Sequence, residues 1–597
     1  MTTSFIHPAL ILIFGALILP FIKEPFKKIY LCTVPILTFL DVIYLSSNPG
    51  VYGVVSFMGG DWTLIFGRVD KLSMIFGFIM SLMAIIGTIY GLHVKDDLQH
   101  MAAWSYVAGS LGVIYCGDYL VLFLFWELMA FASTFLIWFN KDEGSLAAGY
   151  RYLLVHTFGG VILLLGFVLR YQATGNLDFV ALNENNTQLY TWLILAGLML
   201  NAAVPPLHSW LPDAYSKATT TGAVFMCAFT TKTAIYTLIR GFAGFDILIV
   251  LGVIMAIYGI VYAMMENDIR RLLGWEIVSQ VGYMVTGIGI GTALAINGTC
   301  AHAFAHILYK GLLFMAAGAI LHSTGKSKFT ELGGLYKRMP KTLVFMVIGG
   351  VSVSAFPFFS GFVSKSMIIT ASFESHLLVA GFLLTLVSVG TFLVAGLRLP
   401  YLIFFGETRC SEETWQKAED PPWNMTVAMG AAAILCFIIG SYLPFLYNML
   451  PYAEASYNPY NGNHLSETFQ ILAFTVVAFI FLKQKLRARA TISLDLDWFY
   501  RMGGRGFLWL AKNPIQWIDT AWGAAYRVVG LYSLMTTANF WSWFDWHAID
   551  GVVDGSARCI RNLGRRISCI LQQGQIQLTI YFSVTFAAIL LMSYVWL

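Results

Sequence analysis

Apolar runs long enough to cross a lipid bilayer recur from one end of the chain to the other. A helix rises about 1.5 Å per residue, so about 20 apolar residues span the hydrocarbon core. The pattern predicts an all-α polytopic membrane protein. The first run lacks a small-residue cleavage site after it, and we expect it to stay as a helix. The predicted spans are 5–22, 28–46, 70–93, 100–117, 119–139, 152–170, 190–206, 222–240, 246–265, 272–291, 296–322, 342–372, 377–405, 425–447, 467–483 and 575–597.

The lysine and arginine residues between these spans fall mainly on one side. If successive loops alternate across the membrane, most of these residues lie in the loops after odd-numbered spans and in the segment 483–573. Cytoplasmic loops carry the excess of Lys and Arg. We therefore expect the N-terminus outside and 483–573 on the cytoplasmic side. The opposite loops hold only Arg68, Lys71, Arg170 and Arg240.

Residues 484–573 differ from the spans because they mix charges with tryptophans, among them Trp498, Trp517 and Trp546. Tryptophan favours the headgroup layer, and basic amphipathic helices lie in that plane. We expect amphipathic helices on the cytoplasmic face, followed by the last span. They act either as a brace across neighbouring subunits or as a simple surface anchor.

The composition excludes several classes of function. Hydrophobic residues make up 58% of the 597 residues and charged residues only 11%, whereas soluble domains carry about 25% charged residues. The net charge of +4 is uninformative, and nothing supports nucleic-acid binding. The eight cysteines are scattered without a C-x-x-C pair, so we expect no metal site and no bound redox cofactor.

Prolines interrupt two of the predicted spans, Pro205 and Pro206 in one and Pro357 in the other. A proline frees helix carbonyls, which in lipid must face protein or water. Paired interruptions in two halves of a transporter indicate inverted repeats around a mid-membrane path. The predicted regions are 1–99 (N-terminal helices), 100–240 and 246–405 (two inverted five-helix repeats), 425–483 (C-terminal helices), 484–573 (interfacial segment) and 575–597 (last helix).

Three titratable residues share one face of the span 296–322. His302, His306 and Lys310 are spaced four residues apart, so a helix aligns them in one stripe. A lysine at mid-membrane costs about 2.5–3.5 kcal/mol of insertion free energy. This cost indicates that the groups are used, and the movement of protons or ions is a use that fits them.

Further ionisable groups lie inside predicted spans. Burial lowers the pKa of a lysine toward neutrality, a nearby carboxylate raises it again, and histidine titrates near neutrality. Such groups suit a proton path, although buried ion pairs between helices are the alternative. Glu276 is either part of the path or interfacial, and His156, near the cytoplasmic end of its helix, is a candidate proton-uptake group. The candidate relay is Glu127, Lys232, His302, His306, Lys310 and Lys365.

Several short motifs occur in order between residues 60 and 410. They are PheTrpGluLeuMetAla at 125–130, ValProProLeuHisSerTrpLeuProAspAla at 204–214, LysThrAlaIleTyr at 232–236, AspIleArgArgLeuLeuGly at 268–274, IleValSerGlnValGlyTyrMet at 277–284, the stripe within 301–320 and GlyPheValSerLys at 361–365. They resemble the antiporter-like proton-pumping subunits, a family that includes membrane-arm subunits of respiratory complex I and of membrane-bound hydrogenases and large subunits of Mrp-type sodium/proton antiporters. LeuAspLeuAspTrpPheTyrArg at 494–501 looks most like the tail of the D-type Mrp proteins.

The resemblance implies about fourteen core helices, inverted five-helix repeats and a hydrated axis of charged residues at mid-membrane. By motif position, Glu127 matches a glutamate that pairs with a lysine of the first broken helix, and Lys232 matches the lysine of the next helix. The stripe of His302, His306 and Lys310 matches the central relay, and Lys365 matches the charged residue of the second broken helix.

One residue departs from the family pattern. Asn201 stands where the first broken helix of the family carries a lysine, seven residues before His208. The expected partner of Glu127 is therefore missing. Either Lys232 or another cation takes over, or the first half-channel is impaired.

The resemblance implies a proton-translocating subunit of a multisubunit Mrp-type monovalent cation/proton antiporter, multi-pass in a bacterial inner (cell) membrane. The alternative is a proton-pumping membrane-arm subunit of an NADH:quinone oxidoreductase or membrane-bound hydrogenase, without a redox cofactor of its own. A scaffold subunit that has lost transport, suggested by Asn201, and a subunit that drives a carbon-uptake partner stay open. The expected partners are other membrane subunits, the lipid bilayer and protons, with Na⁺ or K⁺ as open alternatives for the cation.

Overall fold

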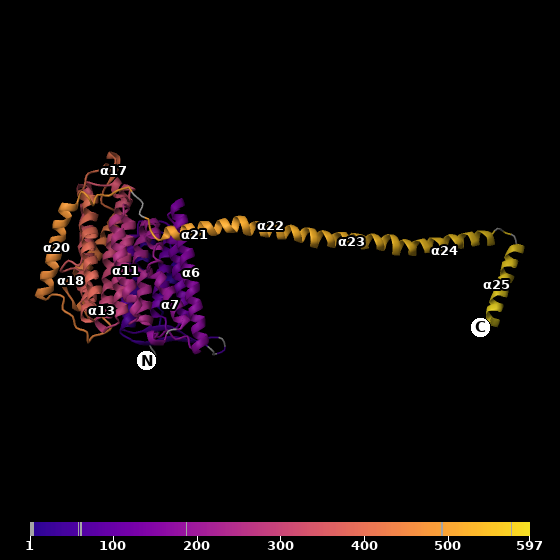
Figure 1. Cartoon of the computed structure of the whole chain (residues 1–597), viewed down its shortest axis with the longest axis horizontal. Helices are drawn as coiled ribbons and strands as arrows, with labels where there is room; N and C mark the ends of the chain where they lie inside the picture. The colour runs from indigo at the N-terminus through magenta and orange to yellow at the C-terminus, as the bar shows by residue number, and fades with distance from the viewer. Residues whose placement is uncertain are drawn as a thin grey trace. The chain divides into compact units, whose positions relative to one another are not determined.

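The chain forms two units in the computed structural model, which describes residues 5–57, 59, 62–186, 188–490, 494–572, 574 and 576–596. The first unit is Met1–Leu496 and the second is Asp497–Leu597. In the first unit, helices from distant parts of the sequence run side by side as a bundle (Figure 1).

The first unit is almost entirely helical. Its helices and strands are α1 (Pro8–Ile18), α2 (Phe26–Ser46), β1 (Gly50–Phe57), β2 (Trp62–Val69), α3 (Lys71–Tyr90), α4 (Asp97–Tyr115), α5 (Tyr119–Trp138), α6 (Glu143–Thr174), α7 (Leu189–Asn201), α8 (Trp210–Lys217), α9 (Thr220–Ala228), α10 (Thr230–Phe242), α11 (Asp246–Met265), α12 (Ile269–Ile290), α13 (Ala293–Thr324), α14 (Pro340–Val353), α15 (Ser360–Glu374), α16 (Leu378–Thr391), α17 (Glu412–Lys417), α18 (Trp423–Ser441), α19 (Pro444–Tyr447) and α20 (Gly462–Leu482).

Eleven helical stretches among the described residues of the whole chain are long and apolar enough to cross a membrane. This finding confirms the predicted polytopic, mainly helical architecture. The fourteen-helix core, the inverted repeats and the region boundaries stay predictions.

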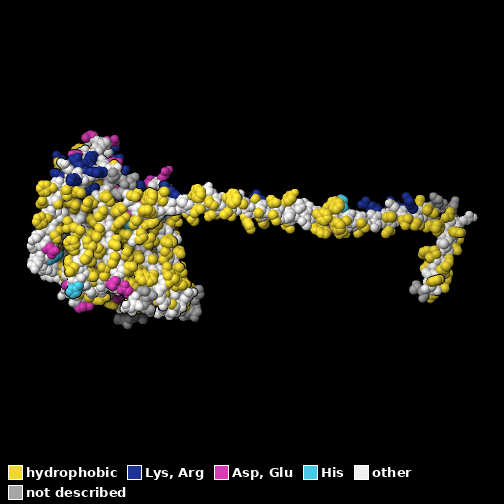
Figure 2. Space-filling model, in the orientation of Figure 1, with side chains coloured by type: hydrophobic (Ala, Val, Ile, Leu, Met, Phe, Trp, Pro, Cys, Tyr) yellow, Lys and Arg dark blue, Asp and Glu magenta, His cyan; other side chains and the backbone are white. Residues whose placement is uncertain are grey.

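The surface of the first unit combines an apolar band with a basic end. Figure 2 shows a broad apolar band on the visible face, with Lys and Arg side chains gathered at the end where α17 lies. α17 belongs to the loop 405–425, which the charge pattern places in the cytoplasm. The apolar band is the surface that lipid and neighbouring subunits cover.

The interior of the bundle holds the helices that carry the candidate relay. The most apolar stretch within 220–242 is entirely buried, and 94% of the most apolar stretch of α13 is buried. Small residues let α11 and α12 approach closely: a Cβ on Gly259 would lie 2.4 Å from the backbone nitrogen of Ser279, and one on Gly282 would lie 2.6 Å from that of Ala256. Such contacts between small residues are typical of helix packing in membranes.

A β-hairpin precedes α3, and the sequence analysis predicted no strand there. β1 and β2 pair antiparallel, with Val55 opposite Leu64. The β-branched and aromatic residues of both segments favour extended backbone. The carboxylate of Asp118 accepts a hydrogen bond of 2.6 Å from the backbone N–H of Ile65, which joins the hairpin to the start of α5.

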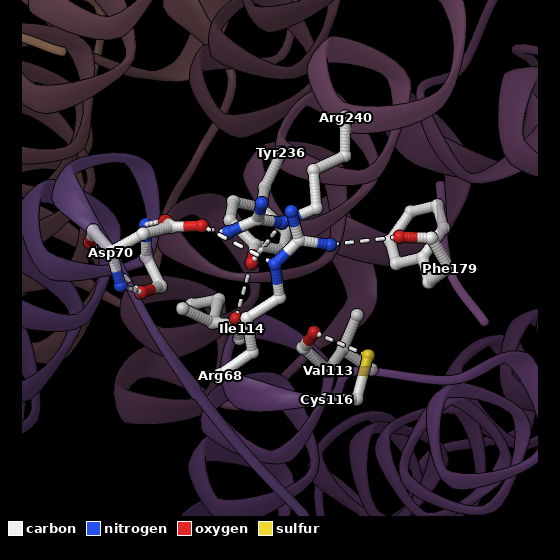
Figure 3. A network of polar contacts seen from close by, with 9 residues as sticks. Arg68, Asp70, Val113, Ile114, Cys116, Phe179, Tyr236 and Arg240 are labelled. Carbon is white, nitrogen blue, oxygen red and sulfur yellow. Dashed lines mark hydrogen bonds and ion pairs between the residues drawn. The ribbon is translucent and has the colours of Figure 1, made fainter. Parts of the chain in front are cut away.

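A charged network joins the start of α3 to the ends of α4 and α10 (Figure 3). Arg240 Nη2 lies 2.7 Å from Asp70 Oδ1, and Arg68 Nε lies 3.4 Å from the same carboxylate. Arg240 Nε also donates to the hydroxyl of Tyr236, which donates to the carbonyl of Ile114. Burial alone raises the pKa of Asp70, but the hydrogen bond and charge of Arg240, the backbone N–H of Ser73 and the charge of Arg68 together outweigh it and hold the pKa below its usual value.

The short segment after residue 493 docks onto the bundle near the first proline break. Tyr262 donates its hydroxyl hydrogen to the Leu494 carbonyl at 2.7 Å, and Tyr258 donates to Asp495 Oδ1 at 2.6 Å. The same carboxylate oxygen lies 3.4 Å from His208 Nε2. His208 is fully buried, so this contact anchors the segment inside the unit.

The second unit is helical throughout its described part. It contains α21 (Asp497–Leu510), α22 (Gln516–Ala525), α23 (Ser533–Phe544), α24 (Asp550–Leu571) and α25 (Ile576–Trp596), with π-helical turns joining α21 through α24. On α24, Val553, Ile560 and Ile567 recur at seven-residue spacing, and arginines 558, 561, 565 and 566 lie between them. This pattern is amphipathic, as expected for an interfacial segment, whereas α25 has the length and hydropathy of a span.

We predict that Asp495→Asn loosens the docked segment. Burial alone raises the pKa of Asp495, but hydrogen bonds with His208 and Tyr258 outweigh this effect and lower it. The contact is therefore fully formed above the ordinary carboxyl pKa of about 3.9 and is lost as the pH falls through the lowered value. Its loss costs about 1–3 kcal/mol of docking free energy.

The measurement is the rate of tryptic cleavage at Lys485 and Arg487 in the detergent-purified chain at pH 7. Asp495→Asn should raise this rate, and Asp519→Asn, an exposed change in the second unit, should not. Equal rates for Asp495→Asn and the unmodified chain would show that the contact does not hold the segment.

Candidate functional site

The stripe expected on 296–322 lies at the centre of the bundle. His302, His306 and Lys310 have no exposed surface. They belong to α13, which runs unbroken for 32 residues and packs against α9, α12, α14, α15 and α18. The stripe therefore faces protein on all sides and not lipid.

Lys310 forms a buried ion pair with Glu276 of α12. The Lys310 ammonium donates to Glu276 Oε2, and both side chains are fully buried. Glu276 is thus an interior residue, which decides between the two positions that the sequence left open. Its second oxygen, Oε1, has no hydrogen-bond partner within the described chain, so one acceptor of the pair is left for water or for a moving proton.

The second proline break supplies the partner of Lys365. α14 ends at Val353 and α15 begins at Ser360, with Pro357 between them. Lys365 Nζ donates to the Val353 carbonyl at 2.7 Å and lies 5.1 Å from the ring centroid of Tyr283. The carbonyl end of a helix carries partial negative charge, so α14 stabilises the ammonium where lipid offers nothing.

The two histidines fill the space between Lys310 and Lys365. His302 Nδ1 lies 3.1 Å from the hydroxyl of Ser364, the residue before Lys365. The rings of His302 and His306 are 6.1 Å apart between centroids. Neither ring nitrogen of His306 has a hydrogen-bond partner among the described residues, which leaves both free to bind water.

Lys232 lies at a third interruption, which the sequence analysis missed. α9 ends at Ala228 and α10 begins at Thr230. Lys232 Nζ donates to the freed Cys227 carbonyl at 2.7 Å and to Thr231 Oγ1 at 3.1 Å. No proline marks this break. Its only sequence signal is a run of three threonines around the lysine, since threonine is a weaker helix former.

The two proline breaks share one backbone turn. Ala203 and Ala355 each stand two residues after the last residue of the preceding helix, and their φ angles are 59° and 58°. The carbonyl of Leu200, near the first break, accepts a hydrogen bond of 3.0 Å from the indole of Trp210. Pro205, Pro206 and Pro357 all lie between helices, as predicted.

The first half of the site is less completely paired than the second. Glu127 Oε1 has no hydrogen-bond partner within the described residues. A Cβ on residue 160 would lie 2.0 Å from this oxygen, so Gly160 makes room for it. Asn201 and His156 are buried and interact with each other, but neither makes a hydrogen bond within 3.5 Å in the part of the chain described.

Sequence reasoning did not single out His208 as a site residue. Its ring packs 5.3 Å from that of Trp275, the neighbour of Glu276 in α12. His208 therefore links the docked Asp495 to α12, the helix that carries Glu276. The motif containing His208 was visible in the sequence, but its partner lies 287 positions later and no spacing rule links them.

The assembled site can hold and pass protons. Lys232 and Lys310 both act electrostatically on His306, as does Lys365, so the three cations and the stripe form one interacting set. Several buried nitrogen and oxygen atoms lack protein partners in the described structure, which is where bridging water binds in polar interiors. Among the described residues, no group of three His, Cys, Asp or Glu side chains is placed to hold a metal ion.

Known proteins are similar in sequence to the region that holds the candidate site. Residues 116–393 match the family described as "NADH:quinone oxidoreductase/Mrp antiporter, TM". The A-type Na(+)/H(+) antiporter protein of Alkalihalophilus pseudofirmus is 28% identical over 81% of this chain and 69% of that protein. The D-type antiporter protein of the same organism is 29% identical over 62% and 80%, and hydrogenase-4 component B of Escherichia coli is 27% identical over 62% of each chain.

Solved structures share the fold. A chain of the Mrp complex from Dietzia sp. DQ12-45-1b superposes with a TM-score of 0.67 at 21% identity, covering 78% of this chain and 98% of that one. A chain of respiratory complex I from Thermus thermophilus gives 0.62 at 23% identity, covering 74% and 98%. This chain is thus similar in sequence to the NADH:quinone oxidoreductase/Mrp antiporter transmembrane family over residues 116–393, and it shares the fold of these two solved structures over 78% and 74% of its length.

Proposed function

We propose that this chain is the proton-translocating subunit of a multisubunit Mrp-type monovalent cation/proton antiporter. The observation that carries the proposal is the enclosed line of titratable side chains from Glu276 and Lys310 through His306 and His302 to Lys365. The similarity to the A-type and D-type antiporter proteins supports this use of the line.

In this proposal the proton moves between nitrogen atoms of the line. The Glu276 carboxylate holds the protonated Nζ of Lys310. When that proton leaves toward His306, the carboxylate loses its counter-charge and attracts the next proton. His302 passes the proton on beside Ser364, which brings it next to Lys365. The Glu276–Lys310 ion pair thus controls when the line of titratable side chains takes up a proton.

The first half feeds this line through Lys232. Glu127 and His156 are its titratable groups nearer the first break, and Asn201 is a neutral residue between helices. Asn201 adds no charge to this half, and Glu127 forms no ion pair with any described residue. Lys232 then takes the role of the cation in this half.

The proposed setting is a hetero-oligomer in a bacterial inner membrane. The structural relatives are chains of multisubunit membrane assemblies, so other membrane subunits are the expected partners. Ion gradients supply the energy, and the exchanged cation is Na⁺ or K⁺.

A second candidate function is proton pumping in a redox-driven complex, where other subunits supply the energy. The similarity to hydrogenase-4 component B is the observation that favours it. The two functions use the same relay and differ in the neighbouring subunits. Co-purification of hydrophilic iron–sulfur or flavin subunits would favour the redox complex, and small membrane subunits alone would favour the antiporter.

We predict that Lys310→Ala abolishes ion-coupled proton flux in vesicles containing the assembled complex. The change removes the cation at the centre of the line, and loss of a proton-transfer group lowers rates by about 100-fold or more. Flux is measured with a pH-sensitive dye after a cation gradient is imposed.

The controls separate loss of transport from loss of folding. Lys310→Ala leaves Glu276 buried without a counter-charge, which costs about 3–5 kcal/mol. The double variant Lys310→Ala with Glu276→Gln removes that cost and should assemble but not transport. Lys328→Ala, at an exposed loop position, should transport normally. Normal flux in an assembled Lys310→Ala complex would rule out the relay.

We predict that Asn201→Lys leaves transport intact or raises it. A lysine at this position provides a counter-ion for Glu127, whose Oε1 is unpaired in the described structure. The same vesicle assay measures the effect, and Asn201→Leu provides the uncharged control. A strong loss of flux in Asn201→Lys alone would mean that the asparagine has a role of its own.

A further inference from the structure

We propose that the cavity beside Lys365 is the outer port of the relay, and that His464 and Glu467 of α20 exchange its protons with water outside. This outer cavity measures about 130 Å³ and lies between α15, α16 and α20. The inference rests on the proposed function and extends it to residues outside the family-matched region 116–393.

The outer cavity joins the buried end of the relay to the surface of the unit. Lys365 on its inner wall is fully buried, whereas Glu467 on its opposite wall is exposed. His464 lines the same space and is half-buried. These three are the titratable side chains of the lining, so a proton that leaves Lys365 here has two acceptors ahead of it.

The position of α20 places the mouth of the cavity near the outer face. The charge pattern puts the loop 448–466 outside, and α20 begins at Gly462. Glu467 lies five residues further, or about 7–8 Å along the helix. Lys365 lies nine residues before the end of α15 at Glu374, or about 13–14 Å from the outer end. The cavity therefore spans the step from the relay to the interface.

The hydroxyl groups that line the outer cavity have oxygen atoms able to accept hydrogen bonds. Ser354, Ser366 and Thr385 donate their hydrogens to carbonyls of their own helices at 2.5, 2.7 and 2.9 Å. Thr370 donates to the hydroxyl oxygen of Tyr457 at 3.3 Å. Their remaining lone pairs accept hydrogen bonds from water or an ammonium group. A cavity lined in this way binds water that carries a proton outward from Lys365.

His464 and Glu467 form a pair at the mouth. They are three residues apart and so share one face of α20. The His464 ring stacks on Phe362 at 5.0 Å between centroids, and its Nε2 is buried without a hydrogen-bond partner among the described residues. Glu467 forms no ion pair with any described residue. Both groups are thus unengaged and able to accept a proton.

The proton exchange between Lys365 and the outside needs no reactant other than water. The Nζ of Lys365 gives a proton to cavity water and becomes neutral, and the Glu467 carboxylate or His464 Nε2 takes up that proton. Release to outer water restores the acceptor, and a proton from His302 restores Lys365. In the opposite direction the same groups load the relay from outside.

The first test asks which face of the membrane reaches the cavity, and it needs no transport. In the assembled complex with the eight native cysteines replaced, Thr370→Cys should react with a membrane-impermeant thiol reagent from the outer face only. Ser456→Cys in the exposed outer loop is the positive control, and Thr299→Cys, buried in α13, is the negative one. Labelling of Thr370→Cys only from the cytoplasmic face, or none at all, would overturn the port.

The second test measures proton flux in the vesicle assay. We expect Glu467→Gln to reduce flux about tenfold, because water alone is a poorer acceptor, His464→Ala to reduce it less, and Glu467→Asp to restore most of it. Glu454→Gln, an exposed carboxylate in the preceding loop, should have no effect. Normal flux in Glu467→Gln contradicts the assignment of Glu467. Normal flux in Lys310→Ala contradicts the proposed function, and the labelling result would still decide whether the cavity opens outward.

Discussion

Charge inside this bundle has to be compensated by the protein itself, because the surrounding lipid offers neither water nor dipoles. The chain meets this constraint with broken helices. The carbonyl of Cys227 receives the ammonium of Lys232, and the carbonyl of Val353 receives that of Lys365. Of the lysines at positions 232, 310 and 365, Lys310 alone has a carboxylate partner among the described residues. These two interruptions thus create the polar environment that holds an ammonium group inside the bundle.

The two halves meet this constraint unequally. In the second half Glu276, His302, Lys310 and Lys365 each have a polar partner, and the cavity beside Lys365 continues from them. In the first half Glu127, His156 and Asn201 are left without hydrogen bonds in the described structure. Ala203 and Ala355 adopt the same positive φ after the preceding helix, so the two breaks share this turn. Their side chains differ, and the buried ion pair of Lys310 with Glu276 lies in the second half.

Much of this arrangement could be predicted because it follows from hydropathy and proline chemistry. The apolar runs locate the helices, and Pro205 and Pro357 mark two breaks. The break before Lys232 could not be predicted, since no proline marks it and threonines occur in unbroken helices as well. The hairpin lay in the loop 47–69 between predicted spans, where alternating residues give a weak signal. Neither the depth of Glu276 nor the contact of His208 with Asp495 is encoded in local spacing, because both depend on how distant helices pack.

The network of Arg68, Asp70 and Arg240 bears on how such a protein prevents a proton leak across the membrane. Two guanidinium groups share one carboxylate there, so the network has a net positive charge. This charge lies at the end of α10, beyond Lys232. Fixed positive charge in a pore raises the electrostatic barrier to protons. In the proposed relay, this charge would insulate the first half from the outside. A proton on Lys232 would then pass to the stripe of α13 and not outward, so that the membrane potential would not be discharged across the first half.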